Sequence, residues 1–400
     1  MDKKKLADIL FLLGFLCFLV AALAIIVFKP KDTWSYYENR SLAQLQRPTL
    51  SSLVDGSYTN SVEPFLQDHA AGRNLLLRVN TLVDFTLLHR PVVNQVIHTK
   101  EMLLGFNPYE IPNQTWIEQQ ADYMASQLAQ LRDLVEGYGG HFYYVSVPGQ
   151  YTYFEQEHPS FLNNRSAYTD IEIPAFVSAM QSYGVNLIEM GSYLEQIGNP
   201  PELYSTTDYH YQFGGAYLTY ETILDTIEQD TGVSLPRLAG DTLSIQELPN
   251  PYLGSRARKV FGLGGIEEHL TIGLPTSPIP FTRTDNGMPS PSLVYTLPHS
   301  DTEEVAYSLY MGGDMGETVI DTDRDTLPTL LIYGDSFTNP VECLMYYSFD
   351  EMRSIDLRHY KDMTLADYIQ TYQPDYVVGI RDYEALLSTD FNGRPFEIQY

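Results

Sequence analysis

The stretch Thr329-Leu-Leu-Ile-Tyr-Gly-Asp-Ser336-Phe-Thr-Asn-Pro340 decides the fold of this chain. Residues 329–333 form an almost continuous apolar run, which is typical of a strand buried on both faces of a parallel sheet. A helical pattern follows from Pro340, a residue that suits the first turn of a helix. A buried strand that leads into a helix is part of a βαβ unit, so we predict an α/β protein.

The alternation of strands and helices continues outward from this stretch. Further strands are predicted at residues 141–148, 185–189, 352–358 and 375–381, and helices at residues 117–136, 173–183, 216–230 and 365–372. This order predicts a doubly wound, mostly parallel sheet. Residues 236–300 are rich in Pro and Gly, and we expect them to form an insertion with irregular or hairpin structure.

The N-terminal segment predicts a membrane anchor. Residues 9–28 carry no charge and are almost wholly apolar, and about 20 helical residues span roughly 30 Å of hydrocarbon. Lysines at positions 3–5 predict a cytoplasmic N-terminus, with the bulk of the chain outside the cytoplasm. The alternative is a cleaved signal peptide, because three alanines within residues 21–24 resemble a cleavage site. The apolar run is longer than the usual h-region, which favours an uncleaved anchor.

These features divide the chain into four predicted parts. They are a cytoplasmic tip at residues 1–5, a transmembrane anchor at 6–28, a juxtamembrane linker and helical segment at 29–95, and an α/β domain at 96–400. Within the third part, residues 61–88 have helical spacing, and a short β pair is expected around residues 92–106.

Composition narrows the classes of function. The chain has 24 Lys and Arg against 51 Asp and Glu, a net charge of −27, and a surface this acidic argues against nucleic-acid binding. The cysteines are Cys17 and Cys343, too few for a disulfide framework or a cysteine-rich zinc site. The basic cluster Arg256-Ala-Arg-Lys259 is either a solvated loop or a docking site for an anionic polymer.

Ser336 is the first candidate for catalysis. Ligands of α/β sheets bind at the carboxyl ends of the strands, and Ser336 follows such a strand end. Free N–H groups at the start of the next helix could stabilise the oxyanion that forms when the serine Oγ attacks an ester. The alternative is that Ser336 or Asp335 only caps the helix.

The segment Asp208-Tyr209-His210-Tyr211 could supply a base and its orienting carboxylate. Side chains at positions i and i+2 share a face in an extended segment, whereas a helix separates them by about 200°. Gly214 and the local Thr and Tyr content favour an extended loop here. A divalent metal on the carboxylates and the imidazole is a competing use of these groups. No His-x-x-x-His motif or dense Asp cluster supports it, and we predict no metal site.

Together these motifs resemble the DHHW family, which belongs with the SGNH-hydrolase-like proteins of alginate O-acetylation. Further landmarks match at Glu38-Asn-Arg40, Asp68-His69 with Arg73, Gly312-Gly313 and Ile355-Asp-Leu-Arg358, so the resemblance covers roughly residues 36–390. It implies an SGNH-hydrolase-like fold. The name-giving Asp-His-His-Trp reads Asp208-Tyr-His-Tyr211 here, and a strand-end Pro-x-Lys reads Pro148-Gly-Gln150.

The resemblance implies a role for each matched residue. Ser336 would be the nucleophile, His210 the base and Asp208 its orienting partner. The supporting and substrate-binding residues are expected to be Gly334, Asp335 and Asn339 around the oxyanion, and Tyr209, Tyr211 and Arg358 at the substrate.

The expected function is that of a membrane-anchored, extracytoplasmic acyl-transfer protein that needs no cofactor. It would O-acetylate an envelope or extracellular polysaccharide through an acetyl-serine intermediate. The relatives imply a multipass membrane O-acyltransferase partner as the acetyl donor. Two alternatives stay open, a carbohydrate acetyl-esterase and a catalytically silent polysaccharide-binding assembly protein.

Overall fold

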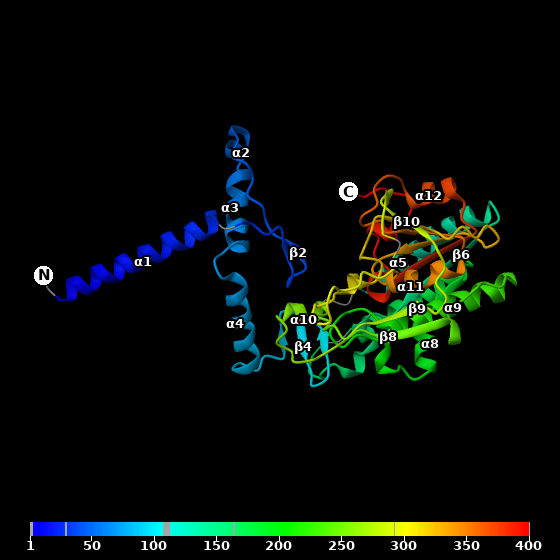
Figure 1. Cartoon of the computed structure of the whole chain (residues 1–400), viewed down its shortest axis with the longest axis horizontal. Coiled ribbons are helices and arrows are strands. Elements are labelled where there is room, and N and C mark those ends of the chain that lie inside the picture. The colour runs from blue at the N-terminus through cyan, green and yellow to red at the C-terminus, as the bar shows by residue number, and fades with distance from the viewer. Residues whose placement is uncertain (1–2, 29, 107–112, 163–164, 292, 400) are drawn as a thin grey trace. The chain divides into compact units, whose positions relative to one another are not determined.

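The computed structural model describes residues 3–28, 30–106, 113–162, 165–291 and 293–399, so residues 1 and 2 of the predicted tip lie outside it. The chain forms two compact units (Figure 1). The N-terminal unit comprises the residues up to Val96 together with Ala257–Gly265. The sheet unit comprises Ile97–Arg256 and Ile266–Tyr400. Part of the predicted insertion therefore groups with the N-terminal unit.

The N-terminal unit begins with α1 (Lys3–Phe28), in which residues Lys4–Ile26 are long and apolar enough to cross a membrane. The predicted helical segment at 61–88 is two helices, because the chain turns at Gly72, which has a left-handed φ of 72°. The remaining elements of this unit are β1 (Trp34–Ser35), β2 (Arg40–Ser41), α2 (Leu50–Val54), α3 (Ser57–Asp68), α4 (Arg73–Thr86) and β3 (Val92–Val93).

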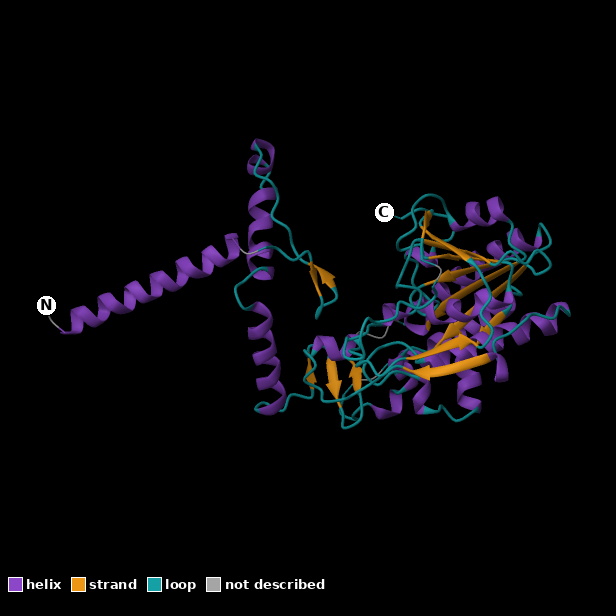
Figure 2. Cartoon of the chain, viewed as in Figure 1, coloured by secondary structure: helices purple, strands orange, loops and turns teal. Residues whose placement is uncertain are grey.

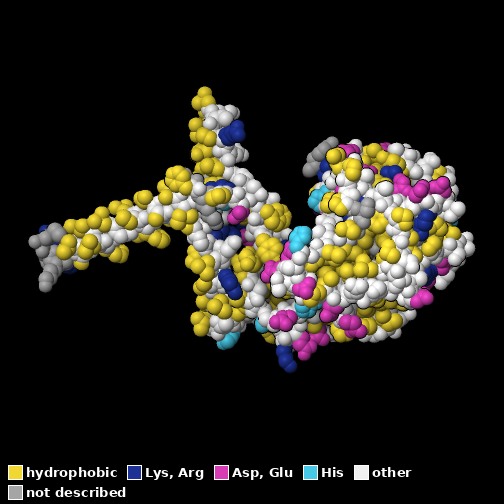
Figure 3. Space-filling view, viewed as in Figure 1, with side chains coloured by type: hydrophobic (Ala, Val, Ile, Leu, Met, Phe, Trp, Pro, Cys, Tyr) yellow, Lys and Arg dark blue, Asp and Glu magenta, His cyan; other side chains and the backbone are white. Residues whose placement is uncertain are grey.

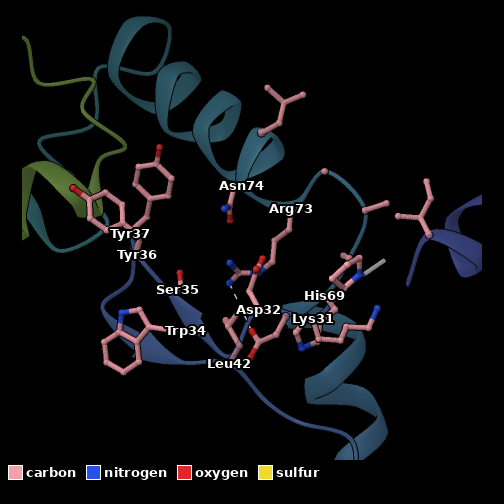
Figure 4. A pocket seen from close by; sticks show the side chains of 17 residues that line it. Lys31, Asp32, Trp34, Ser35, Tyr36, Tyr37, Leu42, His69, Arg73 and Asn74 are labelled. Carbon is pink, nitrogen blue, oxygen red and sulfur yellow. Dashed lines mark ion pairs between the residues drawn. The ribbon is translucent and has the colours of Figure 1, made fainter. Parts of the chain in front are cut away.

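Two of the sequence landmarks form an ion-pair network in this unit, and Figure 4 shows one of its members, Arg73, in the pocket that it lines. The Arg40 guanidinium lies 2.6 Å from the Asp68 carboxylate, and Arg73 lies 2.6 Å from Glu38. The backbone N–H of Ala43 also donates to Asp68, at 2.8 Å. Hydrogen bonding from Arg40 lowers the pKa of Asp68 to about 2, despite the opposing effect of burial. The network links the segment after α1 to the junction of α3 and α4.

The sheet unit is built on an eight-stranded sheet of order β11-β10-β12-β14-β13-β15-β6-β7 (Figure 2). The five strands from β14 to β7 are parallel, and β12, β10 and β11 add antiparallel strands at one edge. This confirms the predicted mostly parallel α/β class. The bounds are β6 (His141–Val147), β7 (Leu187–Glu189), β10 (Thr282–Asp285), β11 (Met288–Pro289), β12 (Glu317–Asp321), β13 (Leu330–Gly334), β14 (Glu351–Ile355) and β15 (Tyr376–Asp382).

Part of the predicted insertion takes the hairpin form and joins the sheet. Strands β10 and β11 lie within residues 236–300, for which either irregular or hairpin structure was expected. They form a hairpin whose two-residue turn, Asn286-Gly287, has positive φ at both positions, as a type I′ turn requires. β10 then pairs with β12 and so extends the main sheet. The Asn-Gly turn signal was present in the sequence, but the strands beside it are too short to stand out.

Helices cover the sheet and bury its strands. α5 (Gln114–Glu136), α7 (Ser166–Ser182) and α12 (Leu365–Tyr372) pack in one core with Leu331 and Tyr333 of β13. The alternating Leu330 and Ile332 are also fully buried, so both faces of β13 are covered as predicted. The other elements are β4 (Val96–His98), β5 (Leu103–Gly105), α6 (Gln150–Tyr153), α8 (Met190–Gln196), α9 (Phe213–Thr231), β8 (Leu243–Glu247), α10 (Ser255–Lys259), β9 (Thr271–Pro275) and α11 (Asn339–Met345).

Candidate active site

The structure brings together the three side chains predicted to form a triad. Ser336 lies two residues beyond the end of β13, and α11 begins three residues later. The Nε2 atom of His210 lies 2.7 Å from the Ser336 Oγ, and its Nδ1 lies 2.9 Å from the Asp208 Oδ1. An alcohol, an imidazole and a carboxylate are therefore joined by two hydrogen bonds across 126 residues of sequence.

A short β-like loop places Asp208 and His210 side by side. Tyr204 and Tyr211 form an antiparallel bridge, and the N–H of Ser205 donates to the His210 carbonyl at 3.1 Å. The segment is not helical, as the i, i+2 spacing required. Both residues consequently point toward the carboxyl end of β13.

Glu268 holds this loop in place. Its carboxylate accepts hydrogen bonds from the Ser205 hydroxyl at 2.8 Å and from the N–H groups of Thr206 and Thr207 at 3.0 and 3.1 Å. The amide of Gln212 also donates to it at 2.6 Å. A half-buried carboxylate with these donors fixes the backbone from which His210 projects.

The Asp208 carboxylate is buried and saturated with donors. It accepts from the Tyr252 hydroxyl at 2.6 Å and from the Ser255 N–H at 2.7 Å and hydroxyl at 3.0 Å. Burial alone would raise the pKa of Asp208, but His210 and the hydrogen bonds from Tyr252 and Ser255 outweigh it. The pKa therefore lies well below its usual range. The carboxylate stays ionised and can stabilise a protonated imidazole.

The imidazole of His210 is held between aromatic rings. The Tyr307 ring stacks on it with a centroid separation of 3.8 Å and an interplanar angle of 5°. The Tyr209 and Phe337 rings contact it at 3.8 and 4.9 Å. His210 is 3% exposed and Ser336 is 6% exposed, so the pair is largely screened from water. Charge interactions within such a site are stronger than in solution.

Tyr209 and Arg256 lie beside the nucleophile. The Tyr209 hydroxyl is 3.4 Å from the Ser336 Oγ, and the Arg256 guanidinium lies over the Tyr209 ring, 5.9 Å from its centroid. The Nε of Arg256 is buried without a hydrogen-bond partner among the described residues. Arg256 belongs to the basic cluster noted in the sequence, and the structure places it one aromatic ring away from the serine.

The three residues predicted around the oxyanion each have a different local environment in the structure. A Cβ on Gly334 would lie 2.2 Å from the Ile380 carbonyl oxygen, so glycine is required where β13 meets β15. The Asp335 carboxylate accepts from the Phe337 N–H at 3.1 Å, and burial raises its pKa. The Asn339 side-chain amide donates to Asp314 at 2.9 Å and is thus engaged away from the serine. Oxyanion binding by these residues stays a prediction.

Two of the residues predicted to bind substrate form hydrogen bonds or ion pairs with other residues of the protein instead. Tyr211 is 1% exposed, and its hydroxyl donates to the Phe337 carbonyl, so it supports the serine loop and does not face a substrate. Arg358 donates to Asp356 at 2.6 Å and to Asp314 at 2.9 Å. Tyr209 is the predicted substrate residue that lies next to the nucleophile.

The geometry disfavours the metal alternative at the triad. The oxygens of Asp208 already accept hydrogen bonds from Tyr252 and Ser255. Elsewhere, Asp314, Asp356 and His359 present ligand atoms within 4.8 Å of one another. The Arg358 guanidinium donates hydrogen bonds to the carboxylates of both Asp314 and Asp356, so these two groups already have a cationic partner.

Sequence reasoning missed Tyr252, Ser255, Glu268 and Tyr307. All four lie in the long segment between α9 and β13, in part of which an insertion with irregular or hairpin structure was expected. Their side chains contact the Asp208–His210 loop through pairings 40 to 100 residues apart along the chain, for which no local motif exists. The many tyrosines of the chain were the only signal, and ordinary core packing explains tyrosines equally well.

Comparison with known proteins places the fold. No protein-family model and no curated protein matches the chain, whereas several solved structures do. PatB1 of Bacillus cereus, in a structure with a sulfonyl adduct, matches with a TM-score of 0.63 at 21% identity, over 76% of this chain and 98% of that chain. A DHHW family protein from Eubacterium siraeum matches with a TM-score of 0.58 at 18% identity, over 77% and 97%. The chain has the fold of a DHHW family protein.

This fold confirms the resemblance that the motifs indicated. The O-acetyltransferase domain of Pseudomonas putida AlgJ also matches, with a TM-score of 0.46 at 12% identity over 73% of this chain and 92% of that chain.

Proposed function

We propose that this protein is a membrane-anchored, extracytoplasmic acyl-transfer enzyme that O-acetylates a polysaccharide through an acetyl-Ser336 intermediate. The observation that carries the proposal is the 2.7 Å contact between the Ser336 Oγ and the His210 Nε2, with Asp208 on the other ring nitrogen. An intact hydrogen-bonded triad also favours catalysis over a silent binding role. The acetyl group and the polysaccharide come from the resemblance to the DHHW family.

The first half of the reaction would load the serine. The Ser336 Oγ attacks the carbonyl carbon of the acetyl donor while His210 Nε2 takes the hydroxyl proton. The ionised Asp208 stabilises the resulting imidazolium, and the backbone N–H of Ser336 binds the oxyanion. When the tetrahedral intermediate collapses, His210 returns the proton to the leaving group, and acetyl-Ser336 remains.

The second half would transfer the acetyl group. A sugar hydroxyl gives its proton to His210 as its oxygen attacks the acetyl-Ser336 carbonyl, and collapse of that intermediate releases the acetylated sugar. His210 then returns the proton to Ser336. Both catalytic side chains are more than nine-tenths buried, and the acceptor that reaches the acyl-enzyme, water or a sugar hydroxyl, decides between hydrolysis and transfer.

The predicted anchor determines on which side of the membrane the enzyme would act. If α1 spans the membrane with its lysines in the cytoplasm, the sheet unit lies outside, where envelope polysaccharides are found. A multipass membrane acyltransferase would supply the acetyl group, and a shared membrane would raise the effective concentration of the two partners.

An acetyl-ester assay with the full chain tests the proposal. We expect the wild-type protein to cleave a chromogenic acetyl ester, and Ser336→Ala to lose about 10³-fold or more of the activity. Ser178→Ala, at an exposed position on α7, is the matched control. Mass spectrometry should find an acetyl group on the Ser336 peptide. A sulfonyl fluoride, the reagent class suggested by the adduct on PatB1, should label the same residue.

The acceptor decides between the remaining alternatives. An added oligosaccharide that becomes acetylated supports transfer, whereas acetate as the sole product supports an esterase. Equal turnover by the wild type and Ser336→Ala would exclude serine catalysis. Glycan binding without any acyl-enzyme would identify an assembly protein.

A further inference from the structure

The pattern of burial in α4 is the reverse of that in an ordinary surface helix, with polar side chains buried and several apolar side chains exposed. The buried positions of this helix are Thr81 and Asp84, both polar. Four of its apolar side chains are exposed instead, and we call them the α4 face: Leu75 at 66% exposure, Leu76 at 65%, Val79 at 48% and Leu82 at 45%. At 100° per residue these four lie on one side of the helix. Leu87 and Leu88, directly after the helix, are 71% and 55% exposed.

The same character extends to α2. Leu50, Leu53 and Val54 of this helix are 82%, 52% and 81% exposed. The space-filling view shows hydrophobic side chains along α1, α2 and α4 (Figure 3). Water is an unfavourable neighbour for so many contiguous apolar groups, and patches of this kind mark a surface that binds another apolar phase.

The start of α4 lies beside the end of the anchor. Ile25 of α1 lines a pocket of about 520 Å³ together with the Asp68–Leu75 stretch that joins α3 to α4 (Figure 4). The Lys31 Nζ lies 5.9 Å from the centroid of the Phe65 ring in α3. Because residues Lys4–Ile26 have the length of a membrane span, Ile25 marks the level at which the span ends. The α3–α4 junction therefore lies at the level of the membrane surface.

The charge of the N-terminal unit suits an anionic membrane. Residues 29–96 and 257–265, the part of this unit beyond α1, contain 9 Lys and Arg and 6 Asp and Glu, a net charge of +3, and the whole unit carries +4. The chain total is −27, so the sheet unit carries −31. Arg78, in the middle of α4, is exposed beside the α4 face. Basic residues next to an apolar helix face attract the head groups of anionic lipids.

We propose that the α4 face lies in the interface of the lipid bilayer that α1 spans. The partner is the lipid surface itself, because the face begins where the membrane span ends and its unit is the basic part of an otherwise acidic chain. The N-terminal unit would then be held to the membrane by two contacts, a spanning helix and an interfacial helix. This inference rests on the proposed anchor.

Single fluorophores can measure the depth of each helix in the membrane. The full chain would be reconstituted into phosphatidylcholine vesicles with and without phosphatidylglycerol, and labelled with an environment-sensitive dye at Leu76→Cys in a Cys17→Ser background. Cys343 is 1% exposed and stays unlabelled. Asn74→Cys, exposed and on the opposite side of α4, is the matched control. We expect nitroxide lipids to quench the dye at position 76 at least about twofold more than at position 74, more so with anionic lipid.

A label on Cys17 in the unmodified chain separates the two proposals. Quenching at Cys17 with none at position 76 would overturn the interfacial helix and leave the anchor intact. No quenching at Cys17 would mean that the anchor itself fails, whatever the activity of Ser336. If position 76 is shielded only at high protein density or by an added membrane protein, the α4 face binds protein and the inference is wrong.

Discussion

At the scale of single residues, the proposed mechanism depends on the hydrogen bonds that orient His210. We expect Asp208→Asn to lower kcat by about 10²- to 10⁴-fold, because an amide cannot stabilise the imidazolium and can favour the wrong tautomer. Stopped-flow measurement of ester cleavage, with Asp241→Asn at an exposed site as the control, checks this. Retention of full activity in Asp208→Asn would contradict the role of this carboxylate.

Tyr252 is a positioning residue in the same network. Its hydroxyl donates to Asp208 at 2.6 Å, and the rest of its ring is buried. Tyr252→Phe keeps the ring and removes one charge-assisted hydrogen bond, which is worth about 1.5–3 kcal/mol, or roughly 10- to 100-fold in rate. We expect kcat to fall in this range with little change in KM and an upward shift in the acidic limb of the pH profile. An unchanged pH profile would reduce Tyr252 to a packing role.

The sequence predicted the three residues that the structure joins by hydrogen bonds, but not the groups around them. Ser336 follows a strand and Asp208 and His210 are two residues apart, so short patterns carry all three. Glu268 and Tyr252 reach the site through contacts 63 and 44 residues apart along the chain. Such contacts form only in the folded chain, and no rule about residue spacing predicts them.

At the scale of elements, Gly334 sets how closely β13 and β15 approach. Because an added Cβ would lie 2.2 Å from the Ile380 carbonyl oxygen, Gly334→Ala must displace one strand. We expect a loss of about 1–3 kcal/mol in the free energy of unfolding, measured by urea denaturation. Gly149→Ala is the control, since its added methyl would meet its nearest neighbour at 3.8 Å. Equal stability of the two variants would contradict the close approach.

Helix α7 buries a carboxyl group whose ionisation opposes folding. Burial raises the pKa of Glu172 to about 8, although Arg165 lies 3.6 Å away. The folded protein thus binds a proton that the unfolded chain releases near pH 4.5, and its stability falls as the pH rises from about 4.5 to 8. We expect Glu172→Gln to remove a few kcal/mol of this pH dependence, at about 1.4 kcal/mol per pKa unit. Parallel pH profiles of the two proteins in urea would refute it.

Elements with strong local patterns were predicted well, and short ones were not. Helix α12 begins and ends where predicted, and β13 is shifted by one residue. Strand β10 was missed, because its pairing with β12 involves a partner more than 30 residues away and its four residues show no strong alternation.

At the scale of the whole molecule, the anchor makes a prediction about the mature protein. If α1 is an uncleaved span, the protein should stay in the membrane fraction after an alkaline wash, and its intact mass should include residues 1–28. Protease added outside the cell should reach the sheet unit and spare the N-terminus. A mature chain that begins near Ile25 would identify a signal peptide instead.

The hydrogen bonds that Tyr252 and Ser255 donate to Asp208, and those that Glu268 accepts from the histidine loop, have a practical consequence for protein engineering. A designer who trims this protein to a minimal scaffold would first delete the loop-rich stretch between α9 and β12, which contains no triad member. That deletion would remove the supports of the histidine loop together with strands β10 and β11 of the sheet, and Ser336 would lose its positioned imidazole. Transfer of the triad to another scaffold therefore requires the segment between α9 and β12 to be transferred as well.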